Sequence, residues 1–353
     1  MPPEDILLVI IMSALTLYAV LGGADFGIGV WEFNSALQTT PSERKLMAKA
    51  IAPVWEVNHV WLIFVLVLMN TAFPTASAAI SRALWVPLLL ALMGIVFRGA
   101  SFVFRNYTDD SVRGQELWTA VFAMASTAAP FFLGVSIGAL ASGMKIQADG
   151  SFDGDYLNDW LTPLSLFTGF FAVGMCAYLS AVYLIREAHV AGDQEQAELW
   201  RRRALATGVW MGVLAATGLV LLSAQAPELW DRLSERGWPI LACSLLLGFA
   251  SLLAVAWRRY TWGAVGAAAT VATVLWGWGV AQYPLLVPPH ITVETAKSSP
   301  AVLLASLYAT AAGAVLLLPS LAWLFYIFKW AKSTTAQPPL EKRGEAAPAG
   351  RSK

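Results

Sequence analysis

The sequence predicts an all-α polytopic membrane protein with about nine transmembrane helices. Of its 353 residues, 58% are hydrophobic and only 13% are charged, whereas soluble domains carry about 25% charged residues. The apolar residues gather in runs of about 20, the length at which a helix crosses a bilayer. The connections between these runs are short, so none could hold a folded domain outside the membrane. We expect two four-helix bundles plus one additional helix.

Nine runs are apolar and long enough to be spans. They cover approximately residues 6–30, 51–72, 82–104, 117–141, 161–185, 204–224, 238–257, 260–281 and 300–329. The N-terminal MPPEDILLVI contains acids but neither Lys nor Arg, which argues against a cleaved signal peptide, so we expect the first run to remain as a span. The sequence therefore predicts a membrane domain over 1–330 and a disordered cytoplasmic tail over 331–353, where Pro, Ala and charged residues accumulate.

The Lys and Arg residues of the connections predict the orientation. Seventeen lie after odd-numbered spans or in the tail, and five lie on the opposite side: Arg82, Lys145, Arg232, Arg236 and Lys297. Since cytoplasmic loops carry the excess of Lys and Arg, we expect the N-terminus outside and the C-terminus in the cytoplasm. The net charge of zero gives no sign of a nucleic-acid partner.

Four ionisable residues lie inside the first three spans. Asp25 lies in GGADFGIG, Glu56 and His59 in PVWEVNHVW, and Arg98 in FRGASFVFR. Charged side chains at such depth cost a few kcal/mol and are usually functional. With a helix rise of about 1.5 Å per residue, Asp25 and Arg98 lie roughly 10 Å and Glu56 roughly 8 Å inside the cytoplasmic ends of their spans. The three helices should therefore bring these groups to one level.

The neighbours of these residues suit a close-packed polar site. Glu56 and His59 are three positions apart and share a helix face, with Trp55 and Asn58 beside it. Small residues around Asp25 allow the first helix to approach its neighbours closely; they are Gly22, Gly23 and Gly27.

The cluster has three interpretations. In the first, Asp25, Glu56, His59 and Asn58 form a proton route open to the cytoplasm, with Arg98 as charge partner, because carboxylates and imidazole are the usual groups of membrane proton relays. In the second, Asp25 or Glu56 pairs with Arg98 only to neutralise a buried charge. The third is a ligand or metal site. His59 could also ligate a haem iron, but no second intramembrane His accompanies it, so a relay role is simpler.

Other classes of function are less consistent with the sequence. An ion-coupled secondary transporter should show matching polar breaks in both halves, and the spans between 161 and 281 hold almost no ionisable residue at depth. Cys176 and Cys243 lie in apolar runs, which favours buried thiols over a metal site or a disulfide. A purely structural or assembly subunit is a further alternative. No residue pattern predicts a catalytic group or a metal ligand set in this chain.

The three motifs, together with YPLLVP at 283–288 before the last span, resemble subunit II of cytochrome bd-type quinol oxidases. The resemblance extends over residues 1–330. It implies a haem-free subunit of a respiratory enzyme in the bacterial cytoplasmic membrane, which oxidises quinol and reduces oxygen to water. The haems are expected in subunit I, the partner that this chain would stabilise and supply with part of a cytoplasmic proton-uptake route. A structural quinone, lipids and a small single-helix subunit are further partners that the resemblance implies.

Some residues of this chain match the family's motifs, and others depart from them. Asp25, Glu56 and Arg98 match the two acids and the first arginine of the family's motifs. His59 stands where Glu or Gln is common, and Val57 stands where many members have Gly. Val103 occupies a position where the family often has an acid, so a proton route through that position must here use other groups.

Overall fold

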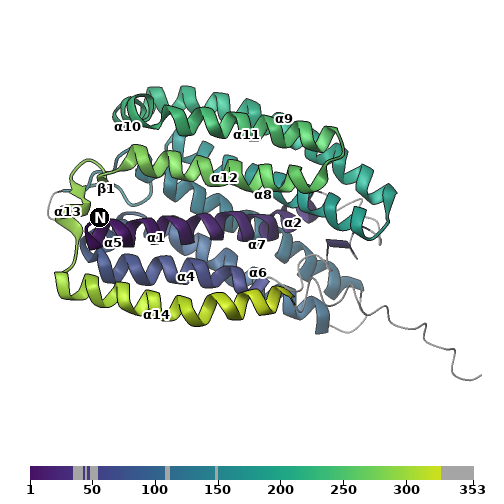
Figure 1. The fold of residues 1–353 in the computed structure, drawn as a ribbon, viewed down its shortest axis with the longest axis horizontal. Coiled ribbons are helices and arrows are strands. Elements are labelled where there is room, and N and C mark those ends of the chain that lie inside the picture. Colours follow the sequence, from purple (N-terminus) through teal and green to yellow (C-terminus); the bar gives the residue numbers. More distant parts are fainter. Residues whose placement is uncertain (35–42, 44–45, 48–54, 108–111, 148–149, 327–353) are drawn as a thin grey trace, which may run out of the picture. The chain divides into compact units, whose positions relative to one another are not determined.

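The computed structural model describes residues 1–34, 43, 46–47, 55–107, 112–147 and 150–326. The chain divides into two compact units, Met1–Ser306 and Leu307–Lys353. The first unit contains the site-bearing helices (Figure 1). The tail predicted at 331–353 lies outside the described residues.

The first span is one helix with a π-helical turn in its middle. It consists of α1 (Pro3–Leu17), η1 (Tyr18–Gly22) and α2 (Gly23–Asn34). Pro3 occupies the first helical position, where its missing N–H has no intrahelical acceptor to lose. Single π-turns inside α-helices are frequent at functional sites. Nothing in the apolar pattern of residues 6–30 predicts this turn.

The second span is bent. It comprises α4 (Trp55–Ala72) and α5 (Pro74–Ala83), and the helix direction bends by 119° between them. Pro74 cannot donate a backbone hydrogen bond, so it ends the ladder of α4 and begins α5. The sequence analysis predicted spans over 51–72 and 82–104, and α5 lies mostly between them, in a run of small residues. α6 (Trp85–Tyr107) and α7 (Val112–Ala141) follow.

The second half of the chain supplies four more long helices. α8 (Pro163–Val190) begins with a capping box between Thr162 and Ser165, and α9 (Gln194–Gln225) is capped by the Asp193 carboxylate. The next span begins with the short α10 (Pro227–Arg232) and the π-turn η2 (Leu233–Gly237), and continues as α11 (Trp238–Ala256). α12 (Tyr260–Gln282) completes the set. α9 thus starts well before the predicted 204, because its first turns carry charged residues.

A small hairpin that the sequence analysis did not predict connects α12 to the last helix. β1 (Leu285–Val287) pairs antiparallel with β2 (Ile291–Thr292), and α13 (Val293–Ala296) follows. Lys297 Nζ then donates to Glu4 Oε1 at 2.9 Å and to Glu294 Oε2 at 2.7 Å. These two carboxylates raise the pKa of Lys297. α14 (Pro300–Phe325) is the final helix described.

Helix contacts define two groups within the first unit. α1–α2, α4, α6 and α7 form one group, and α8, α9, α11 and α12 form the other (Figure 1). α8 joins the groups, since it packs on α2 and α7 as well as on α9 and α12. Among the described residues, eight helices are long and apolar enough to cross a membrane, or nine when the bent α4–α5 pair counts as one span. The predicted all-α membrane fold is confirmed.

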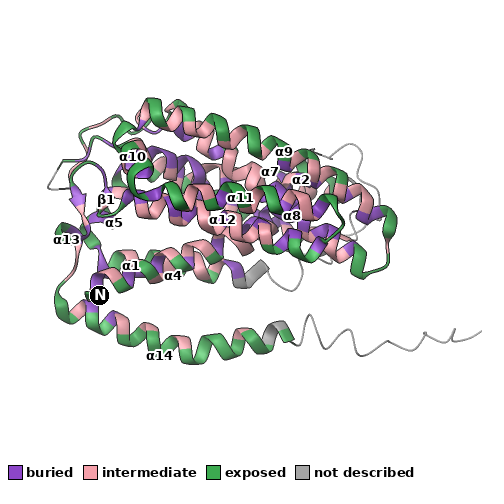
Figure 2. Ribbon diagram, turned by 45° about the horizontal axis from the view of Figure 1, so that its top comes forward, coloured by how far each residue is buried: buried purple, intermediate pink, exposed green. Residues whose placement is uncertain are grey.

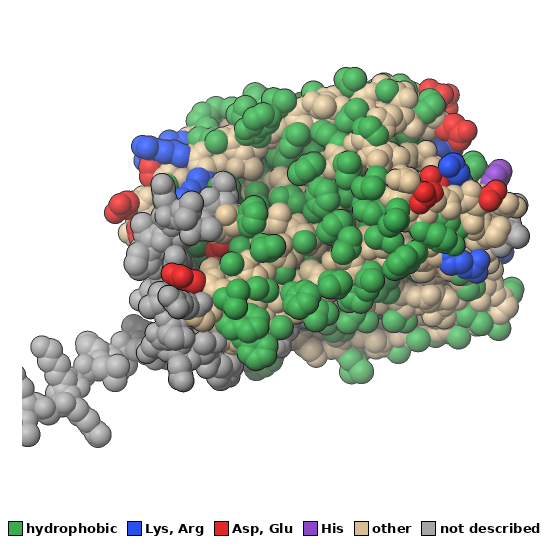
Figure 3. All heavy atoms as spheres, turned by 180° about the vertical axis from the view of Figure 1, so that it is seen from behind, with side chains coloured by type: hydrophobic (Ala, Val, Ile, Leu, Met, Phe, Trp, Pro, Cys, Tyr) green, Lys and Arg blue, Asp and Glu red, His purple; other side chains and the backbone are tan. Residues whose placement is uncertain are grey.

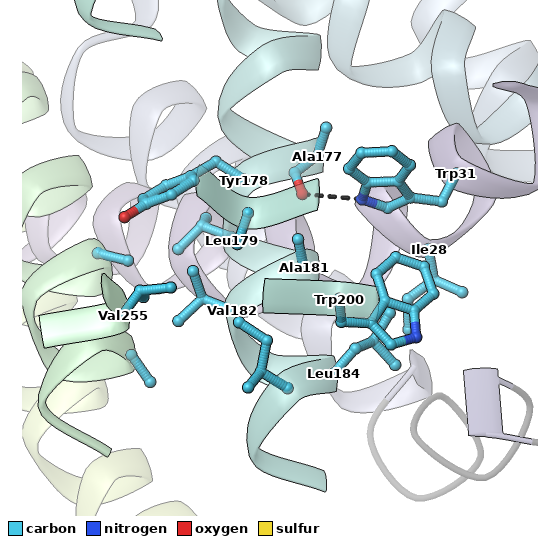
Figure 4. Close-up of a cluster of buried hydrophobic side chains, with 14 of the residues drawn as sticks. Ile28, Trp31, Ala177, Tyr178, Leu179, Ala181, Val182, Leu184, Trp200 and Val255 are labelled. Atoms are coloured by element: carbon cyan, nitrogen blue, oxygen red, sulfur yellow. Dashed lines mark hydrogen bonds between the residues drawn. The ribbon is translucent and has the colours of Figure 1, made fainter. Parts of the chain in front are cut away.

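The core lies around α8. Of the most apolar stretch of α8, 56% is buried, against 6% for α9. In Figure 2, α9 is accordingly coloured mostly as exposed or intermediate. Figure 4 shows the centre of this core, where Trp31 Nε1 of α2 donates to the Ala177 carbonyl of α8 at 2.9 Å. The Arg203 guanidinium lies 4.5 Å from the ring centroid of the fully buried Trp200. α2 is therefore fixed against α8 at the end that carries the loops predicted to be cytoplasmic.

The outer surface suits a bilayer. Large apolar side chains of α9, among them Val209, Val213 and Val220, are more than half exposed. In Figure 3 apolar side chains cover the middle of the face shown, and charged side chains gather at its two ends. Hydrocarbon is the solvent that makes such a surface stable.

Candidate functional site

A buried ion pair joins the first and third spans. Arg98 Nη2 of α6 donates to Asp25 Oδ1 of α2 at 2.6 Å, and the side chains are 1% and 7% exposed. The contact places Asp25 and Arg98 at one level, as their counted depths suggest. Of the two pairings left open by the sequence, the one with Asp25 forms.

Further contacts fix the guanidinium of Arg98. Its Nε donates to Ser126 Oγ of α7 at 3.1 Å, and its Nη2 also lies 3.5 Å from the Asp25 carbonyl. The rings of Phe26 and Phe122 lie 5.0 and 5.1 Å from its central carbon. A buried ion pair that loses one partner costs about 3–5 kcal/mol, because the remaining charge is left uncompensated. Arg98 is thus held by hydrogen bonds and by cation–π contacts.

α4 adds Asn58 and His59 to the same region. Asn58 is 1% exposed, and its Nδ2 lies 3.3 Å from the Leu21 carbonyl in the π-turn. The partly buried ring of His59 lies 6.1 Å from Tyr18 and 6.0 Å from Phe26, measured between ring centroids. Asp25, Arg98, Asn58 and His59 therefore belong to one neighbourhood at the π-turn.

Glu56 is the second residue of α4, but its side chain and that of Trp55 lie outside what the structure describes. The predicted face shared by Glu56 and His59 therefore stays a prediction.

Several polar atoms of this neighbourhood are buried and have no hydrogen-bond partner among the residues that the structure describes. They are Tyr18 Oη, Asp25 Oδ2, Asn58 Oδ1, His59 Nδ1 and Trp61 Nε1. Buried polar atoms are almost always satisfied by protein or by ordered water, and a polar cavity with several such atoms is where buried water is found. The arrangement suits a hydrated cluster that includes the second carboxylate oxygen of Asp25.

The glycines of the first span differ in what they allow. A Cβ on Gly27 would collide with the Cys176 carbonyl and with Ser180 Oγ on α8, so the two backbones meet there. A Cβ on Gly23 would lie 3.0 Å from Leu179, and one on Gly22 would make only ordinary contact with Tyr18. Close approach of α2 to α8 thus depends mainly on Gly27, while a Cβ on Gly29 would collide with Ser126 of α7.

A second ion pair was missed by the sequence analysis. Arg105 Nη1 of α6 lies 3.2 Å from Glu32 Oε2 of α2, and these side chains are 13% and 8% exposed. The signal was available, because Glu32 follows Asp25 by seven positions and Arg105 follows Arg98 by the same number. Ser126 and Phe122 gave no comparable signal, since their roles depend on how α7 packs.

The chain matches one protein family over nearly its whole length. The sequence model described as "Cytochrome bd terminal oxidase subunit II" matches residues 3–328. The "Cytochrome bd ubiquinol oxidase subunit 2" of Bacillus subtilis (strain 168) is 26% identical, over 92% of this chain and 96% of that protein. The "Cytochrome bd-I ubiquinol oxidase subunit 2" of Escherichia coli (strain K12) is also 26% identical, over 77% and 78% of the two chains.

A solved structure has the same fold. It is described as "The structure of bd oxidase from Geobacillus thermodenitrificans", and one of its chains superposes with a TM-score of 0.78 at 25% identity, covering 93% of this chain and 99% of the other. From the motifs of the first three helices, the sequence model and this likeness, it follows that the chain belongs to the cytochrome bd terminal oxidase subunit II family.

Proposed function

We propose that this chain is the haem-free subunit II of a bd-type quinol oxidase, which stabilises subunit I and carries protons toward the site of oxygen reduction. The observation that carries the proposal is the match over residues 3–328 to the subunit II family. The complex would oxidise quinol and reduce oxygen to water in the cytoplasmic membrane of a bacterium, with the N-terminus outside. The distribution of Lys and Arg supports this orientation.

The haems of the proposed complex belong to the partner. The His59 ring packs against Tyr18 and Phe26, at 6.1 and 6.0 Å between ring centroids. Among the described residues, no group of three or more His, Cys, Asp or Glu side chains could hold a metal ion. We assign His59 a hydrogen-bonding role, which is supported by its buried Nδ1, an atom without a hydrogen-bond partner among the described residues.

The proposed proton route passes through the Asp25–Arg98 pair. Oδ1 of Asp25 is held by the guanidinium, while Oδ2 is buried and has no hydrogen-bond partner among the described residues, like polar atoms of Tyr18, Asn58 and His59. Water satisfying these atoms would link them by hydrogen bonds, the arrangement along which protons move in membrane relays. Asp25 and His59 supply the carboxylate and the imidazole of this cluster, the kinds of group that membrane proton relays use.

The proposed contact with subunit I uses the outer faces of α4 and α6. Ile63 and Val67 of α4 and Val96 of α6 are each more than half exposed. Val103 is 42% exposed, so the position where the family often has an acid faces outward from this chain. An apolar face beside the ionic site suits a membrane partner that receives protons there. Lipids, or a small single-helix subunit, would cover other exposed faces such as that of α9.

A structural quinone would fit the second helix group. A cavity of about 460 Å³ lies among α8, α9, α11 and α12, with apolar walls that include Phe171, Met211 and Leu252. Trp278 also lines it, and its buried Nε1 has no acceptor among the described residues. The walls suit an isoprenoid chain, and the indole N–H suits a quinone carbonyl. A quinone bound here would contribute packing to the fold.

Purification from native membranes tests the function. We expect the chain to copurify with a haem-bearing membrane subunit and with quinol:oxygen oxidoreductase activity. A chain that is isolated intact without a haem partner and without this activity would contradict the proposal and would favour a transporter. If the complex is active but the Asp25–Arg98 pair contributes only to stability, the chain would be an assembly subunit without a proton route.

A further inference from the structure

Two ion pairs in succession link α2 to α6, and both helices pack on α7. Asp25 pairs with Arg98 at 2.6 Å, and Glu32 pairs with Arg105 at 3.2 Å. Seven residues separate the two acids, and seven separate the two arginines. Seven residues are about two helical turns, or about 10 Å, so both pairs lie on the same faces of the two helices. The Glu32 pair is the one nearer the predicted cytoplasmic loops.

One aromatic ring lies between the two arginines. The central carbon of Arg98 is 5.1 Å from the ring centroid of Phe122, and that of Arg105 is 4.3 Å from the same centroid. Phe122 is completely buried, and Ser126, one turn further along α7, accepts the hydrogen bond from Arg98. Both ion pairs thus pack against α7, and the Phe122 side chain separates them.

The position of Glu32 suits a group that passes protons to Asp25. It lies on the same helix face as Asp25, it is 8% exposed, and it lies toward the side from which protons would be taken. Val103, by contrast, faces outward and cannot titrate. The carboxylate missing from α6 therefore has a counterpart on α2, facing into the chain.

We propose that Glu32 is the proton-uptake carboxylate that supplies Asp25; this rests on the proposed function. A proton from water at the loop side adds to the Glu32 carboxylate and weakens its pairing with Arg105. The proton then passes through water beside Phe122 to Oδ2 of Asp25, and Glu32 returns to its charged form on Arg105. Asp25 releases the proton toward the hydrated cluster, so both acids end as they began.

The test uses the complete complex with its haem subunit and measures oxygen consumption per haem with a quinol as donor. Glu32→Gln, which cannot carry a proton, should slow turnover at least about tenfold, since proton transfer by a positioned group contributes factors of this size and larger. Glu32→Asp should recover most of the rate. Glu4→Gln is the matched control, because Glu4 is a comparably buried acid paired with Lys297 in a different part of the fold; its turnover should match wild type.

A double variant separates proton transfer from charge balance. Glu32→Gln alone leaves Arg105 unpaired, so instability could also slow the enzyme. Glu32→Gln/Arg105→Gln removes both charges and keeps two amides in place. Slow turnover in this variant with wild-type haem content supports the proposal. Recovery of the rate, or a Glu32→Gln rate within about twofold of wild type, overturns it. Loss of the haem partner from the wild-type preparation would instead refute the proposed function and the role of Glu32 with it.

Discussion

The Arg98 guanidinium donates to Asp25 Oδ1 at 2.6 Å in a position almost closed to solvent, while the other oxygen of the same carboxylate has no hydrogen-bond partner among the described residues. One oxygen is therefore committed to charge pairing. In the function proposed above, the other oxygen takes part in proton exchange, so the same residue would contribute to stability and to proton transfer.

Breaking this pair should destabilise the subunit more than removing both charges. Asp25→Asn leaves Arg98 charged and buried, which costs about 3–5 kcal/mol. Asp25→Asn/Arg98→Gln should recover much of that loss. Thermal unfolding of the purified complex, followed by tryptophan fluorescence, measures the difference. Equal unfolding temperatures for the single and double variants would show that the pair is not isolated from solvent.

His59 should prove unnecessary for haem binding. We expect His59→Ala to leave the number of haems per complex unchanged, because the haems of the proposed complex are held by subunit I. We also expect slower turnover, because an unpaired nitrogen is lost from the hydrated cluster. Haem content by absorption spectroscopy and oxygen consumption on the same sample check both points. Loss of one haem would contradict the assignment.

Gly27 should tolerate no side chain. Gly27→Ala places a methyl group against the Cys176 carbonyl of α8, and overpacking of this kind costs about 1–3 kcal/mol. Gly212→Ala is the matched control, since a Cβ there meets nothing within 4 Å, and Ala favours a helix over Gly by about 0.5–1 kcal/mol. The unfolding temperature should fall for Gly27→Ala and should stay level or rise for Gly212→Ala. A similar fall in both would argue against the close approach of α2 and α8.

Trp278 should hold the head of a quinone in the cavity of the second helix group. Trp278→Phe keeps the aromatic ring and removes the only N–H of the side chain. We expect less quinone to copurify, with turnover near wild type because the cavity is not part of the proton route. Extraction and chromatography of quinones from matched amounts of complex provide the measurement. An unchanged quinone content would contradict binding through the indole.

Helix positions followed well from the sequence, because bilayer thickness sets the length of an apolar run. The exceptions have local causes. The helix Pro74–Ala83 was missed because its residues are mostly small or polar, so its mean hydropathy is low. The π-turn Tyr18–Gly22 was missed because one turn of different winding does not alter apolar periodicity enough to be seen.

The site was only partly visible in the sequence. Asp25 and Arg98 stood out because charge at depth is rare, and counting residues gave their common level. The pairing of Asp25 with Arg98 could not be read from spacing, because it depends on how α2 and α6 pack around α7. Glu32 and Arg105 were overlooked because residues near span ends can reach water, which hides a buried pair among ordinary interfacial charges.

The most direct test of the account is the turnover per haem of the complex carrying Asp25→Asn/Arg98→Gln, measured by oxygen consumption with a quinol donor. The account predicts wild-type haem content with turnover at least about tenfold slower, because the proton acceptor is gone while the buried charge stays balanced. Wild-type turnover at full haem content would contradict it and show that the pair is a static charge network.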